Sequence, residues 1–361
     1  MDERLTVLGF SLFSGIGPRR FAELLGRFGT ALQAWNAEYS EFESIVKPAY
    51  TKKFFEFKKT FDSNAYLKLL EEKNAWFVTK FDEEYPNLLR ESHDPPLVLF
   101  GKGNKKLLRT PNTIGVVGTR KVTTYGRQVT TTITTDLVNA GFCIVSGLAM
   151  GVDAVAHATA LGNNGTTIAV LGCGVDCCNP MENYSLYTKI IEQGSAVVSE
   201  FPLSQPPTKG SFPSRNRIIA GLSKGVVVTE GADDSGALIT AHDAFSDNRP
   251  VFAVPGPITS SLSKGSNELL KKGGNLVLSS SDILSEFGAK PGIAVSRIKK
   301  IKGDSPEEEK IITALQDEEQ SFDDLRQRLG FETAQLNMLL SLMEMKGYIS
   351  LSDSGNYIIS Q

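Results

Sequence analysis

The 361-residue sequence has few cysteines, few histidines and no long uninterrupted apolar segment. Four cysteines are too few for a disulfide framework in a chain of this length, which favours a reducing compartment. No apolar run approaches the length that crosses a bilayer, and Met1-Asp2-Glu3-Arg4 is followed by only a short apolar run. We therefore expect a cytoplasmic protein of two or three domains with no membrane partner.

Three of the four cysteines, Cys173, Cys177 and Cys178, lie close together in the sequence, which raises the question of a zinc site. No histidine lies nearby, and two adjacent cysteines lack the paired spacing of structural zinc ligands. Because Cys173 also follows an apolar, strand-like run, the cluster is more typical of small buried side chains. We expect no metal site here.

Acidic residues are absent from two windows of the sequence. The window from Pro95 to Thr135 contains seven lysines and arginines, and the window from Phe201 to Thr229 contains four. The formal net charge of the whole chain is -3, so the residues outside these windows carry a net charge of -14. If the fold brings the two windows together, they form one positive surface on an acidic protein.

The second acid-free window contains Phe212-Pro213-Ser214-Arg215-Asn216-Arg217, followed by an apolar run typical of a helix. This order places an aromatic ring and two planar cations at a helix N-terminus. Unpaired backbone N–H groups there favour anions, and arginine matches the geometry of phosphate. The segment therefore predicts a site for a phosphate-bearing ligand. A solvated loop with two ion-paired arginines is the alternative.

Residues 1–80 are expected to form a small helical domain. Apolar residues recur at helical spacing from Leu5 to Phe13 and from Phe21 to Phe28. The connection Ser14-Gly15-Ile16-Gly17-Pro18-Arg19-Arg20 resembles a helix-hairpin-helix motif, in which glycine amides approach a DNA phosphate. A turn that serves only helix packing explains the glycines equally well. Two prolines, Pro95 and Pro96, precede an apolar run and suggest a strand near a domain boundary.

Residues 81–288 show short continuous apolar runs that alternate with helix-length segments. Runs without polar alternation are typical of strands buried on both faces, so we predict a Rossmann-like, doubly wound, mostly parallel α/β sheet. No Gly-x-Gly-x-x-Gly follows the first strand, and we expect no cofactor. The predicted strands are Thr113–Val117, Phe142–Val145, Thr167–Leu171, Ala196–Ser199, Gly225–Thr229, Val251–Val254 and Asn275–Leu278.

Glycines and hydroxyl side chains follow several of these strands. Gly118-Thr119-Arg120 follows the first strand, Ser146-Gly147 follows the second, and Ser235-Gly236 opens the helix after the fifth. In such a sheet, ligands bind at the carboxyl ends of the strands, where glycine lets backbone amides approach a phosphate or a sugar. The sequence therefore predicts a ligand site at this edge of the sheet.

The C-terminal region is expected to hold a linker at 289–305 and a winged-helix-like domain at 306–361. Ser321 and Asp324 predict a capping box. From Pro306 to the end the net charge is -7, which opposes contact with DNA phosphates, so we expect a protein-facing or regulatory role. The predicted elements are helices at Pro306–Gln316, Ser321–Leu329 and Glu332–Lys346, and a hairpin from Tyr348 to Ile359 with a turn at Ser352 to Gly355.

Taken together, these motifs resemble the DprA/Smf (DNA processing protein A) family. The resemblance implies a protein that binds single-stranded DNA without sequence preference and forms a homodimer through its Rossmann-like domain. It also implies loading of the RecA recombinase onto incoming strands during natural transformation. The motifs run in consistent order from Tyr85 to Phe287 and include Val117-Gly118-Thr119-Arg120, Ser146-Gly147-Leu148-Ala149, Ala169-Val170-Leu171-Gly172, Phe212 to Leu222 and Ser235-Gly236-Ala237-Leu238.

The resemblance further implies which residues contact the strand. Basic residues of the two acid-free windows would neutralise phosphates, and Phe212 would stack on a base. Where the family pattern has Tyr-Pro and a basic residue, this chain has Asn179-Pro180-Met181, which puts a secondary DNA contact there in question. The expected DNA-binding residues are Gly118, Thr119, Arg120, Gly147, Lys209, Phe212, Arg215, Asn216 and Arg217.

An enzyme is the alternative interpretation. A related Rossmann-like group hydrolyses nucleoside monophosphates with a glycine-rich turn and a downstream glutamate, and Thr229 to Leu238 lies at the comparable place. The turn here begins at Glu230 and lacks the double glycine of that group. Ser146, Asp153 and His157 offer groups for nucleophilic chemistry, but no oxyanion arrangement can be assigned to them. We expect a DNA-binding protein with no catalytic step.

Overall fold

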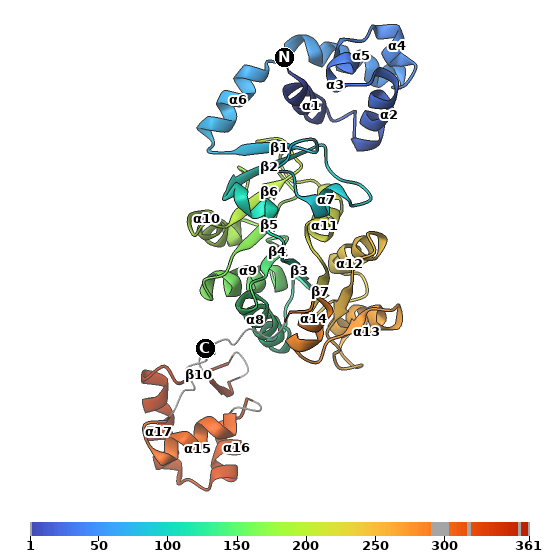
Figure 1. The fold of residues 1–361 in the computed structure, drawn as a ribbon. Helices are drawn as coiled ribbons and strands as arrows, with labels where there is room; N and C mark the ends of the chain where they lie inside the picture. The colour runs from blue at the N-terminus through green and yellow to red at the C-terminus, as the bar shows by residue number, and fades with distance from the viewer. Residues whose placement is uncertain (1, 290–302, 316–318, 353–354, 360–361) are drawn as a thin grey trace. The chain divides into compact units, whose positions relative to one another are not determined.

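The computed structural model describes residues 2–289, 303–315, 319–352 and 355–359 (Figure 1). The chain folds into two compact units, Met1–Gly292 and Ile293–Gln361. Most of the predicted linker 289–305 lies outside the described residues. Within the described ranges, no helix combines the length and the hydropathy that a membrane span requires.

The N-terminal part of the first unit is helical up to Glu72. Its core is aromatic, since the ring of Phe54 stacks on the rings of Phe10 and Phe42 with centroid distances of 5.1 and 4.7 Å. The carboxylate of Asp2 caps the first helix by accepting from the amide of Leu5. The helices are α1 (Glu3–Leu12), α2 (Pro18–Phe28), α3 (Ala31–Asn36), α4 (Tyr39–Glu43), α5 (Pro48–Thr60) and α6 (Ser63–Glu72).

Strand β1 (Trp76–Thr79) joins this helical part to the sheet by pairing antiparallel with β2 (Val98–Gly103). The range 1–80 therefore contains a strand as well as helices, because β1 supplies an edge of the sheet. Arg4 of α1 ties the two parts together. Its Nε atom lies 2.8 Å from Oδ2 of Asp82, and its guanidinium lies over the ring of Phe77.

The sheet of the first unit has the strand order β1-β2-β6-β5-β4-β3-β7-β8-β9 in the part of the chain that the structure describes. Strands β3 to β9 pair in parallel, and β1 and β2 form an antiparallel edge. The predicted mostly parallel α/β sheet is therefore confirmed. Its parallel strands are β3 (Thr113–Val117), β4 (Cys143–Ser146), β5 (Thr167–Val170), β6 (Ala196–Ser199), β7 (Val226–Val228), β8 (Val251–Ala253) and β9 (Asn275–Leu276).

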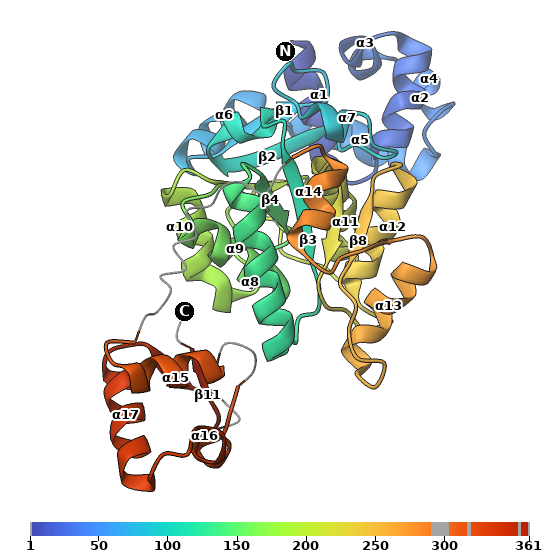
Figure 2. The same ribbon diagram turned by 60° about the horizontal axis from the view of Figure 1, so that its bottom comes forward.

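Helices cover both faces of this sheet (Figures 1 and 2). Figure 1 shows α8 (Thr124–Asn139), α9 (Val152–Gly162) and α10 (Tyr184–Glu192) on one side, and α11 (Ser211–Leu222) and α12 (Gly236–Ser246) on the other. The remaining elements of the unit are α7 (Asn87–Arg90), α13 (Lys264–Lys271), α14 (Ser280–Glu286) and the 3-10 turns η1 (Lys105–Arg109), η2 (Met181–Asn183) and η3 (Ser261–Ser263).

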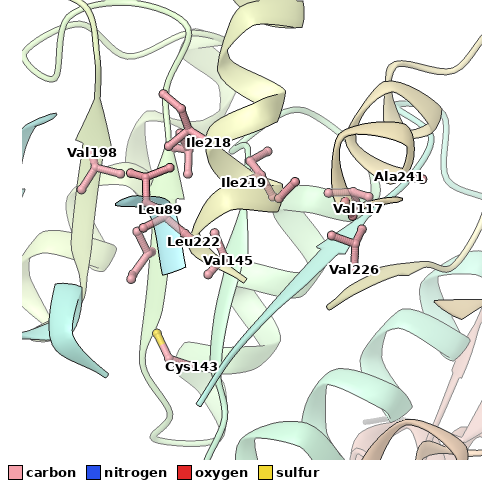
Figure 3. Packing of buried hydrophobic residues seen from close by; sticks show 14 of the residues in the cluster. Leu89, Val117, Cys143, Val145, Val198, Ile218, Ile219, Leu222, Val226 and Ala241 are labelled. Carbon is pink, nitrogen blue, oxygen red and sulfur yellow. The ribbon is translucent and has the colours of Figure 1, made fainter. Parts of the chain in front are cut away.

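Alternate residues of a strand pack against the two helical layers. In β3, Ile114 and Val116 belong to the apolar cluster of α8, α9 and α14, whereas Val117 belongs to the cluster of α11 and α12. Figure 3 shows the second cluster, in which Ile218, Ile219 and Leu222 of α11 lie among strand residues. This packing fixes the position of α11 over the sheet and hence the position of its N-terminal turn.

Helix α11 begins at Ser211, earlier than the sequence suggested. Phe212 and Pro213 lie in its first turn, and Arg215, Asn216 and Arg217 lie within the helix rather than ahead of it. Proline is compatible with a first turn because the amide that it lacks has no partner there. The ring and the arginines are therefore held at helical spacing on a rigid element.

The second unit has the helices and the hairpin of a winged helix, as predicted. Ser321 caps α16 by accepting from the amide of Asp324 at 3.2 Å, and the carboxylate of Asp324 accepts in return from the amide of Ser321, which confirms the capping box. Part of the predicted turn at Ser352 to Gly355 lies outside the described residues. The elements are α15 (Pro306–Leu315), α16 (Phe322–Leu329), α17 (Thr333–Met345) and the antiparallel strands β10 (Ile349–Leu351) and β11 (Tyr357–Ile359).

Candidate nucleic-acid interface

A cleft of about 880 Å³ lies at the carboxyl edge of the parallel strands. It is formed by the loop after β3, the segment before α11, the start of α11 and the N-terminus of α12. In sheets of this kind, this edge is where ligands bind. Of the nine residues expected to contact DNA, seven line this cleft: Gly118, Thr119, Arg120, Lys209, Phe212, Arg215 and Asn216.

The loop after β3 is held close to the sheet. The amide of Thr119 donates to the carbonyl of Glu230 at 2.7 Å, and the amide of Val152 donates to the carbonyl of Thr119 at 3.1 Å. A Cβ atom at Gly118 would lie 2.6 Å from the carbonyl oxygen of Glu230, so only glycine fits there. These contacts present the side chains of Arg120 and Lys121 to the cleft.

Arg120 and Phe212 approach each other across the cleft although they come from different acid-free windows. The guanidinium carbon of Arg120 lies 5.6 Å from the centroid of the Phe212 ring, within the range of a cation–π contact. Arg120 is exposed and Phe212 is partly exposed. Lys209, which is also exposed, lines the same cleft just before α11. The fold thus brings two cations and a ring from both windows to one place.

The N-terminus of α12 opens into the cleft, where Ser235 caps the helix by accepting from the amide of Ala237 at 3.3 Å. Asn216 connects α11 to this helix start, since its Nδ2 atom donates to the carbonyl of Gly236 at 3.0 Å. Asn216 is buried, and its Oδ1 atom accepts from Nε of Arg215. Its contacts therefore order the walls of the cleft.

Arg215 lies in the floor of the cleft and is almost completely buried. Its guanidinium donates to the carbonyls of Gly147 and Val170 at the ends of β4 and β5. Gly147 lies behind the floor, where a Cβ atom would come within 2.5 Å of Nη1 of Arg215. Burial raises the pKa of Asp153, and the positive charge of Arg215 offsets part of this shift. Arg215 thus joins two strand ends to α11 and faces a buried carboxylate.

Arg217 points away from the cleft, which it does not line. Its Nε atom lies 3.0 Å from Oδ2 of Asp94, and Nη2 bonds to Oε2 of Glu200. Burial raises the pKa of Glu200, and the arginine charge opposes this shift. The sequence left open whether the two arginines bind phosphate or form ion pairs, and Arg217 forms ion pairs. The expected phosphate contact of Arg217 has no geometric support, because its side chain is only 12% exposed and has two carboxylate partners.

Only some of the basic residues in the two acid-free windows lie at the cleft, and others lie at the opposite edge of the sheet. Strand β2 runs antiparallel to β6, and Gly103 at its end pairs with Ala196 at the start of β6. Turn η1 therefore lies at the amino edge of the sheet, opposite the cleft. Lys224 lies at that edge too, since its amide donates to the carbonyl of Thr113 at the start of β3. The basic residues at this edge are Lys105, Lys106, Arg109 and Lys224.

Three further charged residues of the cleft were not singled out as binding residues from the sequence. Lys121 adds a cation next to Arg120, and Asp153 and Asp234 add two carboxylates. Among the residues that line the cleft, four are basic and two are acidic, so the cleft is positive on a chain of net charge -3. The position of Lys121 in the first acid-free window is the sequence feature that could have identified it as a residue of the cleft. Asn179, from the segment that departs from the family pattern, also lines the cleft.

The groups considered for enzymatic chemistry are directed elsewhere. The carboxylate of Glu230 accepts from the amide and the hydroxyl of Thr123 at 2.9 and 2.8 Å, so it braces the start of α8. The hydroxyl of Ser146 donates to the carbonyl of Val116, and both Ser146 and His157 are fully buried. Burial lowers the pKa of His157 to about 3, which keeps the imidazole neutral. Of the three residues proposed for nucleophilic chemistry, only Asp153 lines the cleft.

The three clustered cysteines pack in the apolar cluster beside α10. Cys173 is buried and its thiol donates to the carbonyl of Cys177, while Cys177 and Cys178 are partly exposed.

In the turn before α2, Nη1 of Arg20 donates to the carbonyl of Gly15 at 2.7 Å, and the guanidinium lies over the ring of Tyr50. These contacts explain Arg20 by packing, and a DNA contact of this turn stays a prediction.

Two protein-family models together match most of the chain. The family model described as DNA recombination-mediator protein A matches residues 76–288, and the model described as DprA winged helix domain matches residues 299–352. Among curated proteins, Protein Smf of Synechocystis is 37% identical over 306 residues, which cover 83% of this chain and 76% of that protein. DNA processing protein DprA of Bacillus subtilis is 42% identical over 205 residues, covering 57% of this chain and 69% of that protein.

Solved structures show the same relationship. The X-ray structure of DNA processing protein A from Streptococcus pneumoniae aligns with a TM-score of 0.69 and 33% identity, covering 79% of this chain and 98% of that chain. DNA processing protein A from Helicobacter pylori, whose structure was described for its single-stranded DNA binding mode, aligns with a TM-score of 0.54 and 32% identity. That alignment covers 60% of this chain and 97% of the other.

Proposed function

The chain belongs to the DprA/Smf family of DNA processing proteins, and on that premise we propose that it binds single-stranded DNA, without sequence preference, in the cleft. The observation that carries this proposal is the meeting of Arg120, Lys209 and Phe212 at the carboxyl edge of the sheet. The relative from Helicobacter pylori, which has a described single-stranded DNA binding mode, shares the fold.

The chemistry of the cleft suits the backbone and the bases of a single strand. Arg120, Lys121 and Lys209 are exposed cations that can neutralise phosphates. Backbone amides at the N-terminus of α12 add favourable interactions with an anion. The ring of Phe212 provides a stacking surface for a base, and such stacking is worth about 1 to 3 kcal/mol for each base. Neither charge nor stacking distinguishes one base from another, which supports binding without sequence preference.

We further propose that the bound strand is handed to the RecA recombinase and that no catalytic step is involved. The proposal of a non-catalytic role is supported by the positions of Glu230, Ser146 and His157, which do not line the cleft.

We also propose a homodimer through the Rossmann-like domain. Leu276 in the edge strand β9 and Leu278 just after it are 49% and 76% exposed, which offers an apolar edge for a second copy.

A DNA titration with a matched control tests the site. Labelled oligothymidylate is titrated with the wild-type protein and with an Arg120→Ala/Lys209→Ala variant at two salt concentrations. We expect the variant to bind at least about tenfold more weakly at low salt. The slope of log affinity against log salt concentration is expected to fall by about 1.4, because each phosphate contact on a single strand contributes about 0.7.

The control is a Lys106→Ala/Arg109→Ala variant, which removes the same number of cations, both from the first acid-free window, at the opposite edge of the sheet. Its affinity is expected to stay within about twofold of wild type, since these cations lie away from the cleft. An oligonucleotide of mixed sequence is expected to bind as tightly as oligothymidylate. Wild-type protein that ignores both oligonucleotides but hydrolyses nucleoside monophosphates would overturn the proposal.

A further inference from the structure

Helix α17 of the winged helix carries an exposed apolar stripe. Met338, Leu342 and Met345 are 65%, 41% and 87% exposed. Their spacing of four and three residues places them along one face of the helix. The opposite face is complete without them, because Leu336, Leu339, Leu340 and Met343 fill the core of the unit together with residues of α15 and α16. The stripe is therefore not needed for the packing of this unit.

The charged residues of the segment that carries the stripe are acidic. Between 332 and 345 the chain has Glu332 and Glu344 and no lysine or arginine. Lys346 follows directly, but its Nζ atom lies 2.8 Å from Oδ2 of Asp304 and 2.7 Å from Oε1 of Glu308. The last helix of a winged helix that reads DNA needs cations to approach phosphates. Helix α17 instead offers an apolar surface within a region of net charge -7.

The side chains of the stripe suit a protein partner. Three of the six methionines of the chain lie in α17, and two of them, Met338 and Met345, are exposed. Methionine is flexible and polarisable, so surfaces rich in it adapt to apolar side chains of different shapes. Amphipathic helices commonly bind such apolar surfaces through residues spaced by three and four positions.

We propose that the exposed face of α17 is a docking surface for a basic amphipathic helix of a partner protein. The apolar side of the partner covers Met338, Leu342 and Met345, and its lysines or arginines are attracted by the acidic residues of the winged helix. This charge complementarity selects the partner. A second copy of the winged helix has the same net charge of -7 and is repelled, and so is a DNA strand.

The test uses the full-length chain and a labelled synthetic 14-residue helix of leucines and lysines with leucines on one face. A Met338→Ser/Met345→Ser variant is expected to bind this peptide at least tenfold more weakly than wild type in fluorescence anisotropy. The matched control is Met150→Ser/Met181→Ser, which changes two exposed methionines of the first unit and is expected to leave peptide binding unchanged. Affinity for oligothymidylate is measured in parallel and is expected to be equal in wild type and Met338→Ser/Met345→Ser.

A charge reversal provides a second variant that keeps the apolar stripe. Glu344→Lys is expected to weaken binding of the lysine peptide and to strengthen binding of the same peptide with glutamates in place of the lysines. Equal peptide binding by both methionine variants would refute the docking surface, as would equal binding of the lysine and glutamate peptides by wild type. Self-association that is lost in Met338→Ser/Met345→Ser would assign the face to a second copy instead. Oligonucleotide binding that is lost in this variant would assign it to DNA.

Discussion

Arg120 and Arg215 show how surroundings decide what an arginine does. Both line the cleft, but Arg120 is exposed, whereas Arg215 is 4% exposed and donates to the carbonyls of Gly147 and Val170. The guanidinium of Arg215 also faces the buried carboxylate of Asp153, which partly balances its charge. In the proposed complex a phosphate meets the free charge of Arg120 first, and Arg215 mainly maintains the floor of the cleft.

Replacing Arg215 with alanine is expected to destabilise the fold. The substitution leaves two carbonyls buried without their donor and removes the positive charge that offsets the buried carboxylate of Asp153. Removing one of two interacting buried charges costs about 3 to 5 kcal/mol. Urea unfolding followed by circular dichroism measures this loss. Arg120→Ala, the matched substitution of an exposed arginine, is expected to change the unfolding free energy by less than about 0.5 kcal/mol. Equal stability of Arg215→Ala and wild type would show that the floor does not depend on this residue.

The sequence predicted which residues lie at this edge of the sheet better than it predicted the contacts of their side chains. Phe212, Lys209 and Arg120 lie at the predicted edge of the sheet, because strand ends and acid-free windows are visible in the sequence. The pairing of Arg217 with Asp94 and Glu200 was not predictable, since the first partner lies far away in the sequence and no local pattern connects them. The role of Asn216 likewise depends on Gly236, which only the packing of α11 against α12 brings near.

At the scale of elements, the parallel strands were predictable from the sequence, and the antiparallel edge strand β1 was not. Every predicted parallel strand is present, and β3 to β8 are fully buried, because a run that is apolar on both faces has few other stable arrangements. Strand β1 has only four residues and follows a helix directly, so its sequence gives no clear period. The antiparallel direction of β2 also escaped prediction, and that direction carries part of the first acid-free window to the edge opposite the cleft.

The junction between α1 and β1 gives the fold a pH dependence. Burial alone would raise the pKa of Asp82, but hydrogen bonds from Thr79 and the contact with Arg4 outweigh it and lower the pKa below its usual value. A lowered pKa means that the unfolded chain takes up a proton first as the pH falls. The contribution of Asp82 to stability is therefore complete above the usual aspartate pKa and is lost as the pH falls through the lower folded value.

Asp82→Asn tests this dependence. We expect the difference in unfolding free energy between wild type and Asp82→Asn to be largest near pH 7 and to shrink below about pH 4, the ordinary pKa of aspartate. Urea unfolding at several pH values measures it. Glu72→Gln, which removes an exposed carboxylate at the end of α6, is the control and is expected to show no such change. A difference that is constant from pH 7 to pH 3 would contradict the role of the Asp82 charge.

At the scale of the whole molecule, charge is divided along the chain. Residues 1–305 carry a net charge of +4, and residues 306–361 carry -7. The positive cleft lies entirely in the first unit. The winged helix is acidic and carries the exposed apolar stripe of α17. DNA binding and partner docking are therefore expected to be separable functions of separate units.

Truncation after Gly303 tests this separation. The shortened chain keeps every residue that lines the cleft, so its affinity for oligothymidylate is expected to remain within about threefold of the full-length value at physiological salt, where charges beyond a Debye length are screened. Thermal unfolding of the shortened chain establishes that the first unit is still folded. A folded truncated protein that has lost most of its affinity would show that the winged helix takes part in holding the strand.

The tight contact between Gly147 and Arg215 limits how the chain can diverge. A side chain at position 147 would occupy the space of the guanidinium, and a smaller residue at 215 would leave a gap that only a larger residue at 147 could fill. Either substitution alone is expected to disturb this contact, so a paired change is favoured over a single one. Across homologues, these two positions are therefore expected to covary as a pair, independently of the exposed residues that are proposed to contact DNA.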